Sequence, residues 1–195
     1  MRYISTRGQT EPVCGAEAIL RGLAPDGGLF VPEKIPSLPA DFVERLTPLA
    51  YPARAAFVLS LFLPEFDGLE GLCREAYKRF DGPPAPLVRV GGAYILELFH
   101  GPTCAFKDMA LQVLPLLINQ AKALTKETRD IYILTATSGD TGKAALEGFR
   151  DVPGTRVLVF YPEEGVSEVQ KLQMVTQEGK NVAVCAVRGD FDDAQ

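Results

Sequence analysis

Residues 134–145 read LTATSGDTGKAA, a run that passes from an apolar strand through a polar turn into a helix. Apolar residues at 131–136 predict the strand, and the small side chains within 141–150 predict the helix. The turn between them presents backbone N–H groups and hydroxyls at a helix N-terminus, an arrangement that binds anions. It also follows a strand of an α/β pattern, where parallel sheets bind ligands. A plain strand-to-helix turn with a Ser or Thr cap is the alternative interpretation.

This glycine turn does not match the two common phosphate-binding patterns. The P-loop pattern G-x-x-x-x-G-K-[ST] fails because Thr137 stands at the first glycine position and Ala144 follows Lys143. The dinucleotide-binding pattern G-x-G-x-x-G is absent as well. Neither nucleotide-binding motif is therefore supported by this segment.

The alternation of strands and helices continues on both sides of this turn. Further strands are expected at 94–99, 156–161 and 182–187. Helices are expected at 106–124, where Pro115 should bend the helix, and at 167–178, which Gly179 can end. Strands separated by helices of this length indicate βαβ units. The predicted class is therefore α/β with a parallel sheet.

The first part of the chain has a different composition. Residues 1–90 hold most of the prolines, which fix φ and interrupt helices, so we expect short helices joined by rigid turns. Asp26-Gly27-Gly28 is a tight-turn signal, and 69–80 is an amphipathic helix candidate. Residues 82–86 have the composition of a linker. We therefore divide the chain into an N-terminal domain over 1–80 and an α/β domain over 91–195.

Composition excludes several classes of protein. With a net charge of −5, the 195-residue chain lacks the basic footprint of a nucleic-acid-binding protein. The N-terminus lacks the apolar run of a signal peptide, and no apolar stretch is long enough to span a membrane. The four cysteines form no CxxC pair, so no metal site is expected. These features favour a cytoplasmic protein with reduced thiols.

Residues 96–110, LELFHGPTCAFKDMA, form the second segment that can carry chemistry. Lys107 follows a Gly-Pro turn at the expected start of a helix, where the helix dipole repels a cation. That repulsion, together with burial, lowers a lysine pKa and frees the amine to form a Schiff base. The alternative is a surface lysine paired with Asp108. His100 is the only histidine, and we expect it to have a structural or ligand-orienting role.

Taken together, these motifs resemble threonine synthase. The resemblance rests on His100–Thr103 with Ala105–Asp108, followed by Thr137–Gly142. Residues 3–8, YISTRG, and residues 26–32, DGGLFVP, are similar to the opening segments of that family. The similar segments span nearly the whole chain, in order.

The resemblance implies a pyridoxal-phosphate enzyme of fold type II in which Lys107 holds pyridoxal 5′-phosphate as a Schiff base. It places Phe106 beside the cofactor and Asp140 near the cofactor ring. It assigns the substrate carboxylate to four residues of the glycine turn: Ser138, Gly139, Thr141 and Gly142. The implied reaction is that of a lyase in threonine biosynthesis, which converts O-phospho-L-homoserine and water to L-threonine and phosphate.

Members of that family are much longer than this chain, so the resemblance implies an N-terminal domain followed by an incomplete cofactor-binding domain with its C-terminal part missing. Asp190 can cap a helix, yet only a few residues follow it before Gln195. We expect the contacts to the cofactor phosphate and to the pyridine nitrogen to lie beyond Gln195. Residues 1–195 alone are expected to be inactive and poorly stable.

Two other interpretations stay open. Within the same fold, the chain can belong to a threonine-synthase-like phospholyase or a threonine dehydratase, although the N-terminal segment argues against a simple dehydratase. From a different class, it can be a non-catalytic interaction module that keeps half of the fold. Absorbance near the Schiff-base band after cofactor is added separates an enzyme from such a module. The sequence does not fix the oligomeric state.

Overall fold

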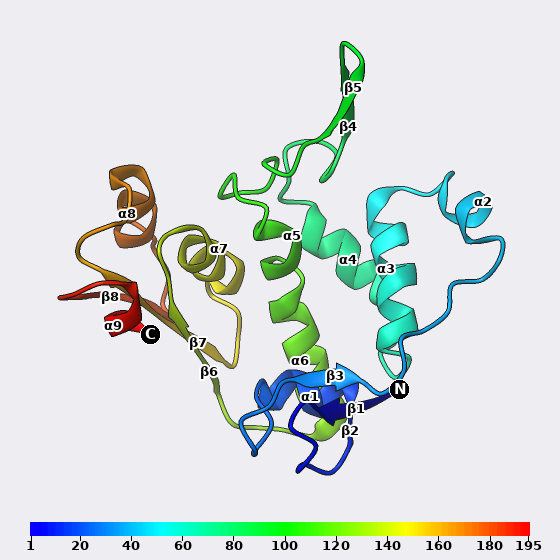
Figure 1. Ribbon diagram of the computed structural model, residues 1–195, viewed down its shortest axis with the longest axis horizontal. Helices are drawn as coiled ribbons and strands as arrows, with labels where there is room; N and C mark the ends of the chain where they lie inside the picture. The colour runs from blue at the N-terminus through cyan, green and yellow to red at the C-terminus, as the bar shows by residue number, and fades with distance from the viewer. The chain divides into compact units, whose positions relative to one another are not determined.

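The computed structural model describes residues 1–195, whose helices and strands are labelled in Figure 1. Contacts between residues divide the chain into two units. The first holds Met1–Ala76 and Leu116–Thr128, and the second holds Tyr77–Pro115 and Arg129–Gln195. The units interleave along the sequence, because one helical segment past residue 115 groups with the N-terminal residues. None of the helices is long and apolar enough to cross a membrane.

The first unit combines a small antiparallel sheet with short helices, as its prolines predicted. Strand β1 (Arg2–Ser5) pairs with β2 (Val13–Cys14) on one side and with β3 (Phe30–Pro32) on the other. The helices are α1 (Gly15–Arg21), α2 (Phe42–Leu46), α3 (Tyr51–Phe62), α4 (Leu69–Tyr77) and most of α6 (Leu114–Thr125). Helix α4 confirms the helix expected at 69–80, although it ends at Tyr77.

The turn Asp26-Gly27-Gly28 lies where the sequence predicted it. One oxygen of Asp26 accepts hydrogen bonds from the Ser5 hydroxyl (2.7 Å) and the Gly28 amide (2.9 Å), and the other accepts the Gln9 amide (3.0 Å). Gly27 has a φ of 77°, and a Cβ on Gly28 would overlap with the Ser5 side chain. Asp26 therefore ties the turn to β1 through one oxygen and to the loop after β1 through the other.

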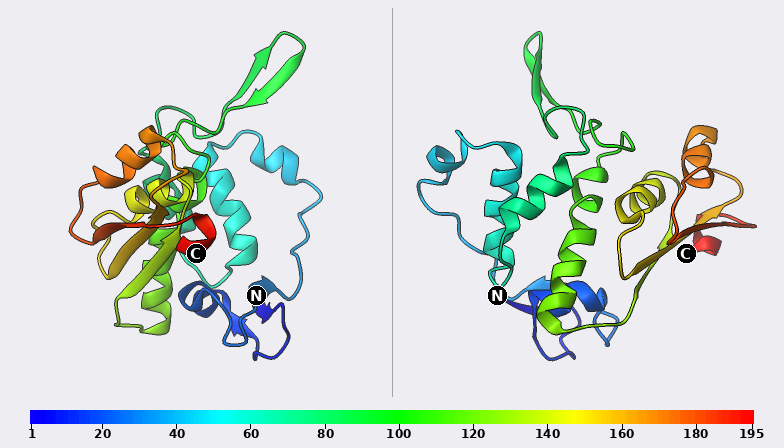
Figure 2. Two further views of the ribbon diagram at one scale, coloured as in Figure 1. Left: turned by 60° about the vertical axis from the view of Figure 1, so that its left-hand side comes forward. Right: turned by 180° about the vertical axis from the view of Figure 1, so that it is seen from behind.

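The second unit contains the parallel sheet that the alternating pattern predicted. Strands β6 (Ile131–Ala136), β7 (Thr155–Pro162) and β8 (Val182–Val187) lie side by side in that order. Helices α7 (Asp140–Phe149) and α8 (Glu168–Val175) lie on one face of the sheet, and the short α9 (Phe191–Ala194) lies on the other (Figure 2). The strands expected at 131–136, 156–161 and 182–187 are confirmed, as is the cap that Asp190 provides for α9.

Alternation along the central strand explains this arrangement. Val157, Val159 and Tyr161 of β7 are buried, and the residues between them are more exposed. Gly142 at the start of α7 lies so close to Val159 that a Cβ would overlap with it. Helix α7 therefore covers this face, and four of its apolar side chains are buried: Ala144, Ala145, Leu146 and Phe149.

One predicted strand forms but pairs with a different neighbour from the one expected. The residues expected to form a strand of the parallel sheet at 94–99 instead form β5 (Ala93–Leu96), which pairs antiparallel with β4 (Leu87–Val90). Val90 stands opposite Ala93, so Gly91-Gly92 is a two-residue hairpin loop, and Gly91 has a φ of 60°. So short a loop can join only antiparallel neighbours, because parallel pairing needs a crossover of about a dozen residues or more.

The single helix expected at 106–124 is in fact two helices. Helix α5 (Asp108–Leu111) has four residues, and α6 begins at Leu114. Pro115 lies in the first turn of α6, where a proline has no helical hydrogen bond to lose, so it starts a second helix instead of bending one. The helix expected at 167–178 is also shorter than predicted, since α8 ends at Val175.

Candidate functional site

The lysine segment folds around the side chain of Asp108. This carboxylate is fully buried and accepts hydrogen bonds from the Thr103 amide (2.8 Å) and the Thr103 hydroxyl (2.9 Å). Gly101 leaves room for it, since a Cβ there would overlap with Asp108. Burial raises the pKa of Asp108, and the hydrogen bonds from Thr103 act in the opposite direction. Asp108 is thus the structural centre of the loop and not a surface partner of Lys107.

Lys107 lies immediately before α5 and is half-buried. Its Nζ is 3.9 Å from the centroid of the Phe106 ring, and 53% of Phe106 is exposed. The two residues therefore present an amine beside an accessible aromatic face. Because α5 has only four residues, its dipole is weak, and the repulsion expected from a full-length helix is reduced.

Thr137 organises the glycine turn that follows β6. Its buried hydroxyl accepts the amides of Gly139 and Gly142, each at 3.0 Å. Gly139 has a φ of 146° and a ψ of −77°, a conformation that residues with a side chain rarely adopt. A Cβ on Gly142 would overlap with the methyl group of Thr137. The two glycine amides that were expected to face a substrate are therefore occupied within the turn.

Other polar groups of this turn remain available. The hydroxyls of Ser138 and Thr141 and the backbone amides of Asp140 and Thr141 have no hydrogen-bond partner within the chain. Ser138 is exposed and Thr141 is half-buried. First-turn amides lack acceptors inside their helix and attract anions. These groups, rather than the glycine amides, can form the anion site that the sequence predicted.

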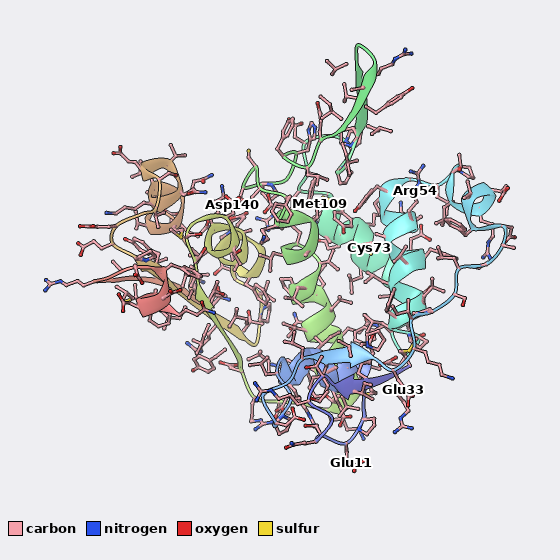
Figure 3. All side chains as sticks on the ribbon, viewed as in Figure 1. Glu11, Glu33, Arg54, Cys73, Met109 and Asp140 are labelled. Carbon is pink, nitrogen blue, oxygen red and sulfur yellow. The ribbon has the colours of Figure 1, made fainter.

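Asp140, labelled at the start of α7 in Figure 3, connects the turn to its surroundings. Its Oδ1 accepts a hydrogen bond from Gln170 Nε2 on α8 (2.8 Å) and lies 3.2 Å from Lys143 Nζ. The hydrogen bond from Gln170 is the largest cause that lowers the pKa of Asp140; Lys143 and the charge of Lys107 lower it further, against the effect of burial. The lysine segment and the glycine turn thus face the same region of the second unit.

Close packing of α5 against α7 brings the two segments together. A Cβ on Gly148 of α7 would overlap with the carbonyl oxygen of Leu111 at the end of α5. Arg79 strengthens this contact by donating to the Gln112 side chain (3.2 Å) and the Glu147 carbonyl (3.3 Å) and by pairing with the Glu147 carboxylate. The candidate site therefore lies wholly within the second unit, between the starts of α5 and α7.

Known proteins share both the sequence and this architecture. Residues 2–77 match the family model described as the threonine synthase N terminus. Threonine synthase of Pseudomonas aeruginosa is 41% identical over 100% of this chain and 42% of its own length. The structure of PLP-bound threonine synthase from Brucella melitensis matches with a TM-score of 0.88 and 39% identity, over 100% of this chain and 43% of that one. The chain matches the N-terminal part of threonine synthases.

The fold class predicted from the sequence is confirmed by these relatives. The structure of yeast threonine synthase also matches over 100% of this chain, with a TM-score of 0.88 at 35% identity. The chain spans about 42% of the length of the P. aeruginosa threonine synthase and 43% of that of Methylobacillus glycogenes. The family resemblance seen in the motifs therefore extends to the whole chain, which corresponds to the N-terminal part of threonine synthases.

His100, the only histidine of the chain, has structural contacts. Its Nε2 lies 2.7 Å from Glu97 Oε2, and its ring stacks on Phe99 with centroids 4.7 Å apart. Its carbonyl oxygen accepts the Asp81 amide at 2.9 Å. These contacts hold the segment that leads from β5 to the lysine loop. Of the two roles expected for His100, the structural one has support in its surroundings.

Sequence reasoning missed the part that Gln170 plays beside the threonine synthase motifs. Gln170 is the third residue after Ser167, whose hydroxyl caps α8. The spacing S-x-x-Q is a capping-box signal and would have marked Gln170 as a helix-capping residue. It would not have revealed the bond to Asp140, which joins residues 30 positions apart. The pairing of Lys143 with Asp140 was missed as well, although both lie on α7.

Proposed function

We propose that this chain is the part of a threonine synthase that holds pyridoxal 5′-phosphate on Lys107 and binds the substrate at the start of α7. The reaction converts O-phospho-L-homoserine and water to L-threonine and phosphate. The observation that carries the proposal is that α5, which follows Lys107, packs closely against α7, which begins at Asp140, within a single unit. The PLP-bound relative from B. melitensis supports the choice of cofactor.

The side chains of the site fit this cofactor by their chemistry. Lys107 supplies an amine that can attach to a carbonyl group, and Phe106 supplies an exposed, flat apolar face beside it. Asp140 supplies a carboxylate within reach of the charge of Lys107. When bound, pyridoxal phosphate is an electron sink that stabilises negative charge at the substrate Cα.

Each residue of the site has a separate task. The Lys107 amine holds the cofactor and, when free, accepts and returns protons at Nζ. The amides of Asp140 and Thr141 and the hydroxyls of Ser138 and Thr141 bind the substrate carboxylate. Phe106 covers one side of Lys107 Nζ and limits the access of water to it. Asp140 stays ionised and keeps a negative charge in the site.

A cytoplasmic location is the second part of the proposal. All four cysteines are free thiols, and Cys14, Cys104 and Cys185 are exposed. Exposed, unpaired thiols suit a reducing compartment. The substrate is a small molecule in this proposal, and the net charge of −5 does not favour nucleic acid as a partner.

Product analysis tests the proposed reaction, with the full-length product of the gene that encodes this chain. With pyridoxal phosphate and O-phospho-L-homoserine, the protein should release phosphate and L-threonine in equal amounts. Borohydride reduction should attach a pyridoxyl group to Lys107, which peptide mapping locates. Phosphate accompanied by a keto acid would identify a phospholyase instead. Absence of both phosphate release and an adduct would leave a non-catalytic module and overturn the proposal.

A further inference from the structure

Asp140 is anchored through only one of its two oxygens. Oδ1 accepts the hydrogen bond from Gln170 and pairs with Lys143, whereas Oδ2 has no partner within the chain. The Asp140 side chain is 45% exposed, so its carboxylate is accessible to a ligand. A carboxylate held at one oxygen has a fixed orientation, and its other oxygen is free to contact what binds beside it.

Lys143 provides the charge that holds this carboxylate. It is only 7% exposed, and Asp140 is its ion-pair partner. Burying an ammonium group costs several kcal/mol unless it is paired, so protonation of Asp140 would leave Lys143 in an unfavourable environment. The charge of Lys143 also reaches Asp108, the centre of the lysine loop. Lys143 therefore keeps Asp140 ionised.

Gln170 sets the orientation of the Asp140 carboxylate. Its Nε2 donates to Asp140, and its Oε1 accepts the Ser167 hydroxyl at 3.0 Å, so the side-chain amide is fixed at both ends. Ser167 is itself placed by its position as the cap of α8. The Gln170 side chain lies against the backbone of Gly139, where a Cβ would overlap with it. One amide thus links α8 to the glycine turn.

We propose that Gln170 is a positioning residue which, together with Lys143, anchors Asp140 so that its free oxygen faces the bound cofactor and substrate. What Asp140 faces rests on the proposed function, whereas the anchoring itself does not. The charged groups around Asp140 are Lys143 on α7 and Lys107 before α5, and the charge of Lys143 also acts on Asp108. Helix α8 contributes the neutral Gln170.

A matched control lies near the other end of the same two helices. Gln177, just beyond α8, donates its Nε2 to Glu147 Oε2 on α7 at 2.9 Å. This hydrogen bond has the same chemistry and nearly the same length as the bond from Gln170 to Asp140, but it touches no residue of the site. Gln170→Met and Gln177→Met therefore remove equivalent contacts between the two segments, and only the first removes support from Asp140.

Two measurements on the full-length protein test the positioning role. Gln170→Met should lower kcat about tenfold, the usual cost of a lost hydrogen bond to a charged group, with a smaller change in KM. Gln177→Met should leave kcat unchanged. In the Asp140→Asn background, Gln170→Met should have little further effect, because the two residues act as one unit.

The second measurement does not depend on activity. The pKa of Asp140, followed by NMR without added cofactor, should rise in Gln170→Met and in Lys143→Met and stay the same in Gln177→Met. If Gln170→Met does not fold, Lys143→Met tests the same anchor. An unchanged pKa of Asp140, or equal losses of kcat in Gln170→Met and Gln177→Met, would overturn the inference. If the protein made no threonine but the pKa of Asp140 still rose in Gln170→Met, the proposed function would be refuted. The anchoring of Asp140 by Gln170 would still be supported.

Discussion

Asp26 and Asp140 both stand at glycine turns, one in each unit, and the chain uses them in opposite ways. Asp26 has both oxygens bonded, one to Ser5 of β1 and to Gly28 of its own turn, the other to Gln9 in the loop after β1. Asp140 has one oxygen bonded and one without a partner in the chain. The pKa of each is lowered, that of Asp26 to about 2 chiefly by the Ser5 hydroxyl and that of Asp140 chiefly by Gln170.

The difference shows how a stabilising carboxylate can be told from a ligand-binding one. When every acceptor position is filled by neighbours, the side chain contributes to the fold and has little left for a ligand. When one oxygen is anchored and the other is free, the side chain is oriented but still available. The same contrast holds for two threonines: the Thr6 hydroxyl accepts the Leu29 amide at 3.0 Å, whereas the Thr141 hydroxyl has no partner in the chain.

The largest effect is expected from Lys107, which decides whether the second unit carries the chemistry. Lys107→Ala should lower threonine formation at least about 10³-fold, because it removes the amine that we propose holds the cofactor and moves protons. Lys171→Ala, at an exposed position on α8, is the control and should keep full activity. Steady-state rates with O-phospho-L-homoserine provide the measurement. A reduced pyridoxyl adduct on Lys143 in place of Lys107 would contradict the assignment.

The two aspartates themselves give the next largest effect. Asp140→Asn should lower kcat about tenfold or more, because the ionised carboxylate beside Lys107 is lost. Asp26→Asn should leave kcat of the folded protein unchanged and lower the urea concentration at which it unfolds. Kinetics and urea titrations on both variants provide the comparison. A similar loss of kcat in both would remove the distinction between the two turns.

A smaller effect should separate the two threonines. Thr141→Val should raise KM for the substrate about five- to tenfold, since it removes a hydroxyl that we propose donates to the substrate carboxylate. Binding of pyridoxal phosphate should change little. Thr6→Val removes a hydroxyl that is already bonded, so it should affect stability and not KM. Substrate titration and cofactor titration of each variant check this, and equal losses of substrate and cofactor affinity in Thr141→Val would mean that the glycine turn is only structural.

The smallest effect concerns pH. Because the pKa of Asp26 falls from 3.8 to about 2 on folding, its ionised form is favoured in the folded state. The stabilisation is therefore fully present above the unfolded pKa and is lost as the pH falls from about 4 to about 2. The urea midpoint of the wild type should drop over this range more than that of Asp26→Asn. If the urea midpoints of the two proteins fell in parallel with pH, ionisation of Asp26 would not contribute to the stability of the fold.

Local patterns predicted the sheet of the second unit well. The strands at 131–136 and 182–187 were placed residue for residue, because each is an apolar run bounded by polar turns. The hairpin of β4 and β5 was missed because β4 has only four residues, and its pairing depends on the turn that follows it. The break between α5 and α6 was missed because a proline near the start of a helix and one inside a helix look alike in sequence.

In the candidate site, too, the sequence predicted some features and missed others. Lys107 and Asp140 could be named because they stand in family-like motifs of the sequence. The sequence could not predict the hydrogen bonds from two glycine amides to the Thr137 hydroxyl, or the hydrogen bond from Gln170 to Asp140. Both depend on where side chains meet after folding, which no periodicity or composition records.

The tight contact at Gly148 sets how closely α7 packs against α5. Any side chain at residue 148 would push α7 away from Leu111, and the starts of the two helices carry Asp140 and Lys107. A library screened for altered activity should therefore tolerate almost nothing at this buried glycine, although it belongs to none of the motifs. Gly148 therefore helps to set the distance between the Lys107 amine and the Asp140 carboxylate without touching either group.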